Sequence, residues 1–271
     1  MPSYFDLHVH TTKGSGDSSL SPDDLVAEAA RIGLRGVTLT EHGGWADLRQ
    51  FREFARSQQV VLVHAREFET EYGHVLVYGL NEHPPGAMEV KTLRKAVDRV
   101  GGYMVVAHPF RNLFNRPPYN QSLLYADPAG YPKTAKDAVN HPLFELLDDV
   151  EALNGGTADG ENLFALEVAR WRGKPGTGGS DAHSTHGLAR GATLFDGEVR
   201  SEAELMEALR AGAYGPIVGM NLGEPRPFDS APSPQPSPIK GEGVGPFDPP
   251  PAASEGAVGG PDGSQGPFGR G

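Results

Sequence analysis

Residues 4–40, YFDLHVHTTKGSGDSSLSPDDLVAEAARIGLRGVTLT, alternate between β-type and helical patterns within one short stretch. Residues 4–9 are rich in apolar and aromatic side chains and predict a strand. Ser21 is a suitable N-cap, and Pro22 followed by two acids favours a helix that runs through Ile32. Residues 36–40 then predict a second strand. The stretch is therefore typical of a strand–helix–strand unit.

The same alternation continues over most of the chain. Beyond residue 40 the patterns predict helix 45–57, strand 60–69, strand 74–80, helix 89–100, strand 103–107, strand 150–153, helix 160–171, strand 192–195, helix 202–211 and a last strand near residue 217. Repeated strand–helix units imply a mainly parallel α/β sheet, which is either an open doubly wound sheet or a closed barrel. Residues 111–147 interrupt the rhythm and are rich in Pro, Tyr and Asn, so we expect a lid-like insertion there.

Composition separates a body from a tail. Residues 223–271 hold 11 of the 36 glycines and 12 of the 24 prolines. A segment so rich in both residues buries too little surface to offset its ordering entropy, so we expect a disordered tail. The remaining residues, 1–222, are enough for one domain with a hydrophobic core.

The overall composition also excludes several classes of protein. The chain of 271 residues has no cysteine, which excludes disulfide partners and thiolate metal sites. Its formal net charge of −11 argues against broad nucleic-acid binding, which relies on many contacts from Lys and Arg to phosphates. No apolar run approaches the roughly 20 residues of a membrane-spanning helix. We therefore expect no membrane partner and a soluble, cytoplasmic protein.

Metal-compatible side chains recur where the expected strands end. They are His8, His10, His42, Glu67, His74, His108, Asp181 and His183. In a parallel barrel these points share one face, on which catalytic residues gather. His8 and His10 lie two residues apart in a strand, so both imidazoles project to the same side and can reach one ion. Asp181 and His183 repeat this spacing, and nitrogen and oxygen donors without sulfur suit Zn, Mn or Fe.

Several motifs, taken together, point to a known family. They are Asp6-Leu7-His8-Val9-His10-Thr11, Asp17-Ser18-Ser19-Leu20-Ser21-Pro22, Thr40-Glu41-His42, Glu67, Gly73-His74, Ala107-His108-Pro109-Phe110, Asn154-Gly155 and Ser180-Asp181-Ala182-His183. In content and order they resemble the PHP (polymerase and histidinol phosphatase) family of metal-dependent phosphoesterases. The resemblance covers most of residues 1–222 and implies a distorted (β/α)7 TIM-like barrel that holds two or three divalent ions.

By position, the resemblance also implies which side chains hold these ions. A first ion would be held by His8, His10, Glu67 and Asp181, a second by Glu67, His74 and His108, and a third by Asp17, His42 and His183. The chain departs from the family pattern at two of these motifs. Asp17 lies seven residues after His10, two more than usual, and Glu41 stands where aspartate commonly precedes the histidine. The second change affects a residue expected to hydrogen-bond behind the ligands.

The resemblance implies a hydrolase. An ion lowers the pKa of its bound water toward roughly 7, so a metal-bound hydroxide can attack phosphorus without a serine or cysteine nucleophile. Arg111 and Arg190 are expected to bind the phosphate, because a guanidinium group contacts two oxygens at once. We expect hydrolysis of a phosphoester in a small phosphorylated metabolite or nucleotide. Histidinol phosphatase activity and 5′–3′ exonuclease activity on short oligonucleotides remain open.

Two further interpretations belong to other classes. An amidohydrolase-type barrel also begins with His-x-His but uses a strand-end lysine as a bridging carbamate, whereas Glu67 holds the bridging position here. A non-catalytic, metal-stabilised PHP scaffold or regulatory module would have an eroded ligand set, whereas all nine positions are filled here. Of the remaining histidines, His64 is expected to pack within its strand, and His83 and His141 are expected to lie in loops.

Overall fold

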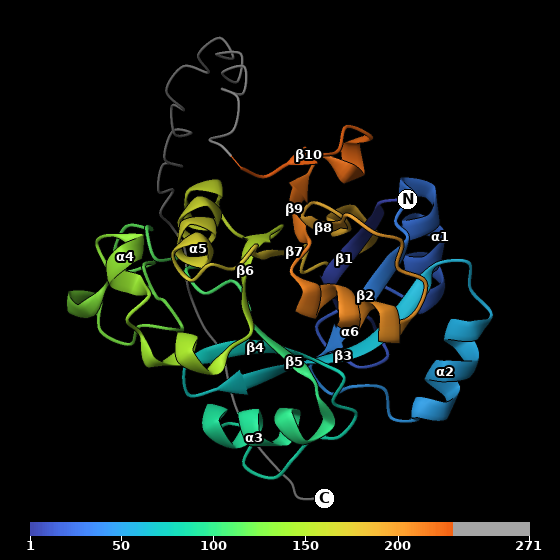
Figure 1. The fold of residues 1–271 in the computed structure, drawn as a ribbon, viewed down its shortest axis with the longest axis horizontal. Coiled ribbons are helices and arrows are strands. Elements are labelled where there is room, and N and C mark those ends of the chain that lie inside the picture. Colours follow the sequence, from blue (N-terminus) through green and yellow to red (C-terminus); the bar gives the residue numbers. More distant parts are fainter. Residues whose placement is uncertain (230–271) are drawn as a thin grey trace, which may run out of the picture. The chain divides into compact units, whose positions relative to one another are not determined.

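The computed structural model describes residues 1–229, in which the strands form one ten-stranded sheet (Figure 1). The strands are β1 (Ser3–Val9), β2 (Gly36–Glu41), β3 (Val61–Thr70), β4 (Gly73–Tyr78), β5 (Tyr103–Val106), β6 (Asp149–Asn154), β7 (Thr177–Gly179), β8 (Ala192–Phe195), β9 (Tyr214–Val218) and β10 (Arg226–Pro227). Their order across the sheet is β10-β9-β8-β1-β2-β3-β4-β5-β6-β7. The central strands are buried, as their apolar sequences predict.

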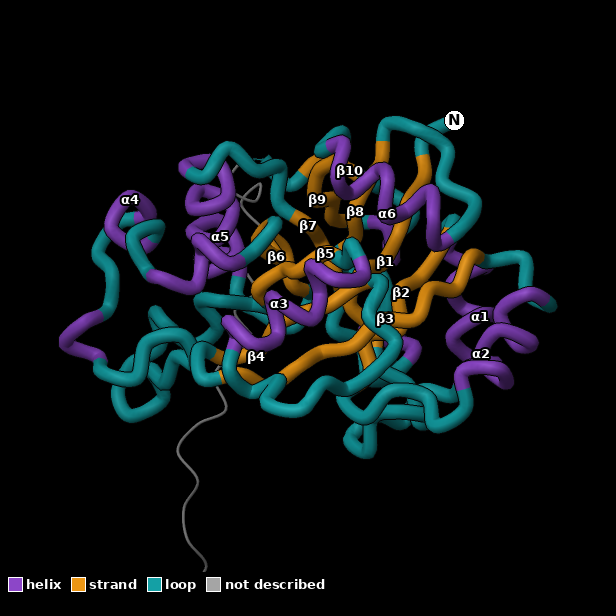
Figure 2. The backbone as a smooth tube through the Cα atoms, turned by 60° about the horizontal axis from the view of Figure 1, so that its bottom comes forward, coloured by secondary structure: helices purple, strands orange, loops and turns teal. Residues whose placement is uncertain are grey.

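Six α-helices accompany these strands in the described part of the chain. They are α1 (Pro22–Ile32), α2 (Leu48–Arg56), α3 (Val90–Val100), α4 (Ala135–Ala138), α5 (Asp159–Trp171) and α6 (Glu202–Ala211). The side chain of Ser21 accepts the N–H of Asp24 and begins α1 where the sequence predicts it. In Figures 1 and 2, α1 and α2 lie together at one end of the sheet, and α4 and α5 lie at the other. None of the described helices is long and apolar enough to cross a membrane.

The sheet is mixed, whereas the sequence predicts a mainly parallel one. The pairs β1–β2, β2–β3, β5–β6 and β6–β7 are parallel, and the pairs β3–β4, β4–β5, β1–β8, β8–β9 and β9–β10 are antiparallel. The expected α/β class is confirmed. The predicted count of seven β/α units is not confirmed, because β4 follows β3 directly after a turn at residues 71–72 and runs antiparallel to it.

The sheet curls so that the segment after β7 meets β1. The N–H of Asp181 donates to the carbonyl of His8 at 2.7 Å, and the N–H of His10 donates to the carbonyl of Ala182 at 3.0 Å. A side chain on Gly179 would collide with Cβ of His8, because the two Cβ positions would be 2.4 Å apart. The glycine-rich stretch, in which no strand was expected, is therefore what allows β7 to approach β1 closely.

The insertion at residues 111–147 packs against the body through its own buried side chains. It contains the short helical turns η1 (Pro128–Gly130) and η2 (Pro142–Leu146) as well as α4. Leu124, Leu143 and Phe144 are buried in the same apolar cluster as Phe110. Leu123 lies against Gly73, directly before His74, so the insertion reaches the edge of the candidate site. Its role as a lid remains a prediction.

Residues 223–229 also pack on the body, although composition assigns them to the tail. β10 pairs with β9, and the N–H of Phe228 donates to the carbonyl of Pro216 at 2.9 Å. Phe228 is 5% exposed and joins a small apolar cluster that includes Leu153 and Leu166. One buried aromatic side chain thus anchors a proline-rich segment. The rest of the expected disordered tail, residues 230–271, lies outside the described residues.

Candidate metal centre

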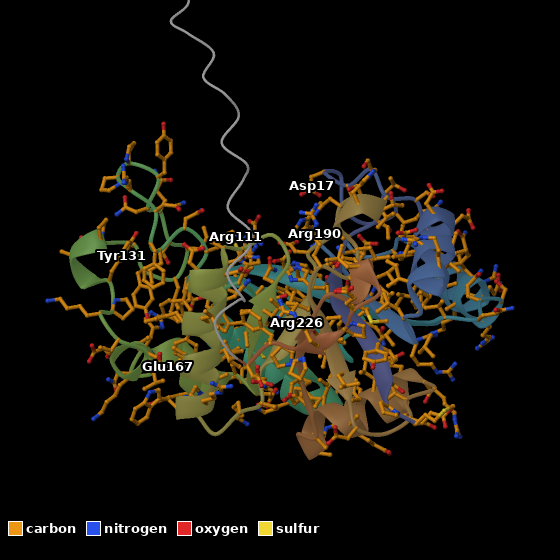
Figure 3. The ribbon with its side chains drawn as sticks, turned by 90° about the horizontal axis from the view of Figure 1, so that it is seen from above. Asp17, Arg111, Tyr131, Glu167, Arg190 and Arg226 are labelled. Carbon is orange, nitrogen blue, oxygen red and sulfur yellow. The ribbon has the colours of Figure 1, made fainter. Side chains whose placement is uncertain are left out.

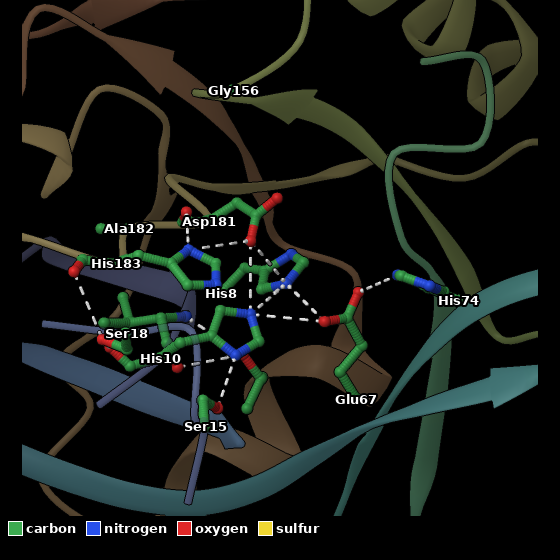
Figure 4. A network of polar contacts seen from close by, with 12 residues as sticks. His8, His10, Ser15, Ser18, Glu67, His74, Gly156, Asp181, Ala182 and His183 are labelled. Carbon is green, nitrogen blue, oxygen red and sulfur yellow. Dashed lines mark hydrogen bonds and ion pairs between the residues drawn. The ribbon is translucent and has the colours of Figure 1, made fainter. Parts of the chain in front are cut away.

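The nine side chains predicted as metal ligands converge at one end of the sheet. Figure 4 shows six of them, which are His8, His10, Glu67, His74, Asp181 and His183. They come from β1, β3 and β4 and from the segments that follow β1, β2, β5 and β7. His74 reaches this end because β4 is antiparallel to β3, so the first residues of β4 lie beside the last residues of β3. His108 and Asp181 both have positive φ angles, +30° and +56°. Such backbone strain in non-glycine residues is characteristic of functional sites.

Four side chains form the buried centre of this group. Nε2 of His8 and Nε2 of His10 lie 3.0 Å apart. Both atoms lie within 3.3 to 3.5 Å of Oε2 of Glu67 and of Oδ1 of Asp181. Ligand atoms that stand roughly 2.1 Å from one tetrahedral ion are roughly 3.4 Å from one another. The observed spacing therefore fits three ligands, from His8, His10 and Asp181, around a single cation, with Glu67 within reach of both imidazoles.

The second carboxylate oxygen of Glu67, Oε1, faces the imidazoles of His74 and His108. Oε1 lies 2.9 Å from Nδ1 of His74 and 3.2 Å from Nε2 of His108. The carboxylate is 4% exposed and lies between these imidazoles and those of His8 and His10. His8, Glu67 and His108 also form a compact group of potential ligand atoms. The geometry is that of a carboxylate able to bridge two ions.

Asp17 joins the site from the loop after β1. Its Oδ2 lies 3.4 Å from Nε2 of His42 and 3.2 Å from Nε2 of His183. Nδ1 of His42 in turn lies 3.4 Å from Oε2 of Glu67. The extra residues between His10 and Asp17 are accommodated by a turn within the loop, so the longer spacing does not move Asp17 away. The side chain of Asp17 is 59% exposed, which makes this the open side of the centre.

The carboxylates and His10 at the centre are in the protonation states that bind a cation, whereas His8 would release a proton on binding one. Burial opposes the charged forms of Glu67 and Asp181, yet nearby His8 helps to hold both pKa values well below their usual range. Burial likewise opposes the charged form of His8, but Glu151, Asp181 and Glu67 raise its pKa well above the ordinary value. Burial lowers the pKa of His10 to about 4, which keeps that imidazole neutral. Anionic carboxylates and a neutral imidazole are the forms that bind metals.

Glu41, where the family commonly has aspartate, accepts hydrogen bonds behind the centre. Glu41 is buried, and its Oε2 accepts hydrogen bonds from the N–H of Thr11 at 3.0 Å and from the hydroxyl of Ser15 at 2.7 Å. Oγ of Ser15 also lies 3.0 Å from Nδ1 of His10. A hydrogen bond donated from Nδ1 leaves Nε2 free to bind an ion. The longer glutamate therefore supports His10 through Ser15.

Glu151 in β6 is a functional candidate that the sequence analysis did not select. Its side chain is buried, Oε1 lies 2.8 Å from Nδ1 of His8, and Oε2 accepts the N–H of His108 at 2.7 Å. The sequence does indicate that Glu151 has a special role, because an acid within the apolar run 150–153 needs a hydrogen-bond or charge partner once it is buried. The partner itself was not predictable, since it lies in a distant strand.

Asp6, two residues before His8, has a structural role for which the sequence pattern alone gives no indication. Its Oδ1 accepts the N–H of Ser180 at 2.8 Å, and its Oδ2 accepts the N–H of Ala189 at 2.9 Å. Burial raises the pKa of Asp6 to about 6. Asp6 thus ties β1 to both ends of the segment that carries Asp181 and His183.

The two arginines expected to bind phosphate differ in their surroundings. Arg111 donates from Nη2 to Oδ2 of Asp181 at 2.5 Å and to Oδ1 of Asn154 at 2.7 Å, and from Nε to Oγ1 of Thr157 at 3.1 Å. Arg190 is exposed and has no ion pair within residues 1–229. In Figure 3 both arginines lie on the same side of the ribbon as Asp17. Arg190 is therefore the freer of the two guanidinium groups.

A cleft of about 360 Å³ opens beside the centre on the side of β3. It is lined by His42, Glu67, Phe68, Glu69, His83 and Met88. His83 lies in an exposed loop, as expected, and its ring is 5.1 Å from that of Phe68. The cleft therefore joins two candidate ligands to an apolar wall that carries one carboxylate, Glu69.

The other histidines lie apart from the candidate ligands. His64 is 3% exposed and packs edge-on against Phe51, in agreement with its expected place within a strand. His141 lies before η2, where its Nδ1 accepts the N–H of Leu143 at 3.2 Å. Both therefore have structural roles that account for them.

Comparison with known families identifies the domain. The model for the PHP domain matches residues 6–134, and a second model, described as PHP-associated, matches residues 159–214. The chain belongs to the PHP family. Seven of the nine candidate ligands lie within the PHP-domain match, and Asp181 and His183 lie within the PHP-associated match.

The curated relatives of this PHP chain are much longer proteins. A stretch of 64 residues is 34% identical to an error-prone DNA polymerase from Nocardia farcinica and 38% identical to one from Mycobacterium tuberculosis. Each match covers 24% of this chain and 6% of the polymerase. The chain thus spans a small fraction of these relatives.

Several solved structures share the fold at low sequence identity. A two-domain protein from Bacteroides vulgatus that contains a predicted PHP-like metal-dependent phosphoesterase has a TM-score of 0.57 and 21% identity, over 79% of this chain and 64% of that one. PsfC from Pseudomonas syringae has a TM-score of 0.54 and 15% identity, over 82% and 94%. Endonuclease Q, solved with a 27-mer duplex substrate bearing an abasic lesion, has a TM-score of 0.53 and 14% identity, over 79% and 58%. These likenesses establish the fold.

Proposed function

We propose that this protein is a metal-dependent phosphoesterase that hydrolyses a phosphoester in a small phosphorylated metabolite or nucleotide. The observation that carries the proposal is the convergence of four side chains, in which Nε2 of His8 and Nε2 of His10 lie 3.0 Å apart and both lie 3.3 to 3.5 Å from a carboxylate oxygen of Glu67 and of Asp181. Membership of the PHP family supports the same reaction class. A module without catalytic function would not require so complete a set of convergent ligands.

The donor set fits divalent Zn, Mn or Fe because it combines imidazole nitrogens with carboxylate oxygens. Two or three ions would be held by His8, His10, Asp17, His42, Glu67, His74, His108, Asp181 and His183. When bound, such ions activate water and offset the negative charge of phosphoryl oxygens. The hydroxyl of Ser15 donates to Glu41 and is thereby held away from a nucleophilic role. Arg190 would orient an incoming phosphate, and its exposed position on the same side as Asp17 supports this role.

The cleft beside His42 and Glu67 is the place we propose for the organic part of the substrate. Phe68 and Met88 offer apolar contacts, and the exposed carboxylate of Glu69 accepts hydrogen bonds. A second phosphate lying beside Glu69 would be repelled. The cleft therefore favours a monoester with a neutral or cationic organic group over a nucleoside bisphosphate.

The proposal is tested by turnover. Purified protein is supplied with Mn²⁺ or Zn²⁺ and assayed with p-nitrophenyl phosphate, sugar and amino-alcohol phosphates, histidinol phosphate and nucleoside bisphosphates. We expect phosphate release that a chelator abolishes and that Asp181→Asn removes. Asp159→Asn, which changes an exposed acid in the first turn of α5, is the matched control and keeps full activity. Full activity of Asp181→Asn, or turnover that survives chelation, would contradict the proposal.

Two alternatives are separated by the same assay. The likeness of the fold to endonuclease Q makes a short oligonucleotide a second candidate substrate, so a 5′-phosphorylated oligonucleotide is included and analysed for 5′–3′ shortening. A non-catalytic PHP scaffold or regulatory module is indicated if the protein binds metal but releases phosphate from none of these compounds.

A further inference from the structure

A chain of hydrogen bonds, closed into a circuit by one ion-pair contact, connects two candidate ligands behind the metal centre. Nδ1 of His8 lies 2.8 Å from Oε1 of Glu151. Oε2 of Glu151 accepts a hydrogen bond from Nδ2 of Asn154 at 3.0 Å. Oδ1 of Asn154 accepts Nη2 of Arg111 at 2.7 Å, and the same nitrogen donates to Oδ2 of Asp181 at 2.5 Å. Oδ1 of Asp181 then lies 3.4 Å from Nε2 of His8 and closes the circuit.

The circuit also holds the backbone where it is strained. The N–H of His108, whose φ is +30°, donates to Oε2 of Glu151 at 2.7 Å. Asp181, whose φ is +56°, is held by Arg111 through its side chain. Non-glycine residues keep such angles only when surrounding contacts enforce them. Glu151 and Arg111 are therefore placed to fix two strained candidate ligands.

There is little space for the circuit to rearrange. Glu151 and Asn154 are 1% and 0% exposed. A Cβ on Gly179 would stand 2.9 Å from Oε1 of Glu151. The buried carboxylate is held by Gly179 on one side and by its hydrogen bonds to Asn154 and His108, and a carboxylate so held fixes the ring that donates to it.

The geometry also separates two roles for Arg111. The two oxygens of Asp181 face different partners, since Oδ1 faces His8 and His10 and Oδ2 faces Arg111. A cation bound at Oδ1 would leave the contact from Arg111 intact. Arg111 is thus able to orient Asp181 while the metal centre is loaded, and it need not act as the phosphate-binding group that its sequence position suggested.

We propose that Glu151, Asn154 and Arg111 are positioning residues that act as one unit, which orients His8, His108 and Asp181 for cation binding. This inference rests on the proposed metal centre. Glu151 fixes the ring of His8 and the backbone of His108, Arg111 fixes the carboxylate of Asp181, and Asn154 joins them. No hydrogen bond or ion pair joins Glu151 to Arg111 within residues 1–229, so coupling between them passes through Asn154 on one side and through Asp181 and His8 on the other.

The test is a double-mutant cycle read out by Mn²⁺ affinity rather than by turnover. Metal-free wild type, Glu151→Gln, Arg111→Lys and the double variant are titrated with Mn²⁺ by calorimetry. Each single change is expected to weaken the tightest site by about 10- to 100-fold, the range for residues that orient metal ligands. Because the residues act as a unit, the double variant is expected to be little weaker than the worse single variant. The visible spectrum of the Co²⁺-loaded protein is expected to change in Glu151→Gln.

Glu161→Gln is the matched control. Glu161 is also a buried glutamate, 4% exposed, and it accepts one backbone N–H, from Phe114, at 3.2 Å without touching a candidate ligand. It is expected to keep Mn²⁺ affinity and the Co²⁺ spectrum. If Glu151→Gln does not fold, as judged by circular dichroism, Asn154→Ala replaces it in the cycle.

Three results would overturn the inference. They are an unchanged Mn²⁺ affinity in either single variant, losses that multiply in the double variant, and an equal loss in Glu161→Gln. If the wild type binds no Mn²⁺, the result contradicts the proposed metal centre itself, and the proposed positioning unit fails with it. This outcome is distinguishable from the three above, in which the wild type binds Mn²⁺.

Discussion

Ser15 donates its hydroxyl to Oε2 of Glu41 at 2.7 Å, which leaves the serine oxygen to accept a hydrogen bond from the ring of His10. The pair shows why glutamate is tolerated at position 41. Its longer side chain lies beside Gly14, where any Cβ would stand 2.7 Å from Cγ and 3.0 Å from Cδ of Glu41. The absence of a side chain at residue 14 therefore makes room for the larger acid.

Ser15→Ala is expected to weaken metal binding without unfolding the protein. The change frees Nδ1 of His10, so the ring loses the partner that leaves Nε2 available for an ion. Loss of such a supporting contact costs about 10-fold or more in metal affinity. Titration with Zn²⁺ measures the effect, and Ser57→Ala, which removes an exposed hydroxyl that bonds Phe54 and Gln58 away from the candidate ligands, is the control. Equal affinities for Ser15→Ala and wild type would refute this role.

Arg190→Ala is expected to raise KM for a phosphomonoester roughly tenfold while changing kcat little, because it removes a charged hydrogen-bond donor to the bound phosphate. Arg111→Ala should instead lower metal affinity, since Arg111 is held against Asp181. Steady-state kinetics at saturating Mn²⁺ separate the two effects. An unchanged KM in Arg190→Ala would exclude it from phosphate binding.

His64 makes stability depend on pH. Burial lowers the pKa of His64 to about 4 from an ordinary 6.5, so between these values the unfolded chain binds the proton and the folded protein does not. The stability that the neutral ring provides is present above pH 6.5 and is lost as pH falls toward 4, by at most about 3 kcal/mol. His64→Leu removes this dependence. The difference in unfolding free energy between variant and wild type should therefore shift in favour of the variant from pH 7 to pH 4, and a difference independent of pH would contradict the assignment.

Phe228 is expected to contribute to the stability of the domain. Phe228→Ala removes a buried ring next to Leu153 and Leu166 and should lower the unfolding free energy by about 3 kcal/mol. Urea denaturation measures the loss. A change below about 0.5 kcal/mol, the range of ordinary surface substitutions, would show that β10 is not held on the body.

Much of the fold was accessible from local patterns. Ser21 and Ser201 accept the N–H groups that begin α1 and α6, and both helices have the bounds that periodicity predicts. Strand direction was not accessible, because alternation of apolar residues is the same in parallel and antiparallel strands. β7 was missed, since Gly178 and Gly179 have no side chains to form a pattern.

The candidate site, like the fold, has a part that local sequence patterns predict and a part that they do not. His8 and His10 were found because two residues of spacing in a strand place both rings on one side. The circuit through Glu151 and Arg111 was not predictable, because its long-range hydrogen bonds join residues 43 to 143 positions apart and no local pattern records which of them meet. Arg111 was predicted as a phosphate ligand from its place after His108, before its contact with Asp181 was known.

The central claim is that nine separated side chains hold divalent cations together. Calorimetric titration of the metal-free protein with Mn²⁺, beside Asp181→Asn, tests it most directly. We predict two or three ions per wild-type chain and loss of the tightest site in Asp181→Asn, with the circular-dichroism spectrum unchanged. A wild type that binds no Mn²⁺, or an Asp181→Asn variant that binds it as tightly and in the same number, would contradict the account.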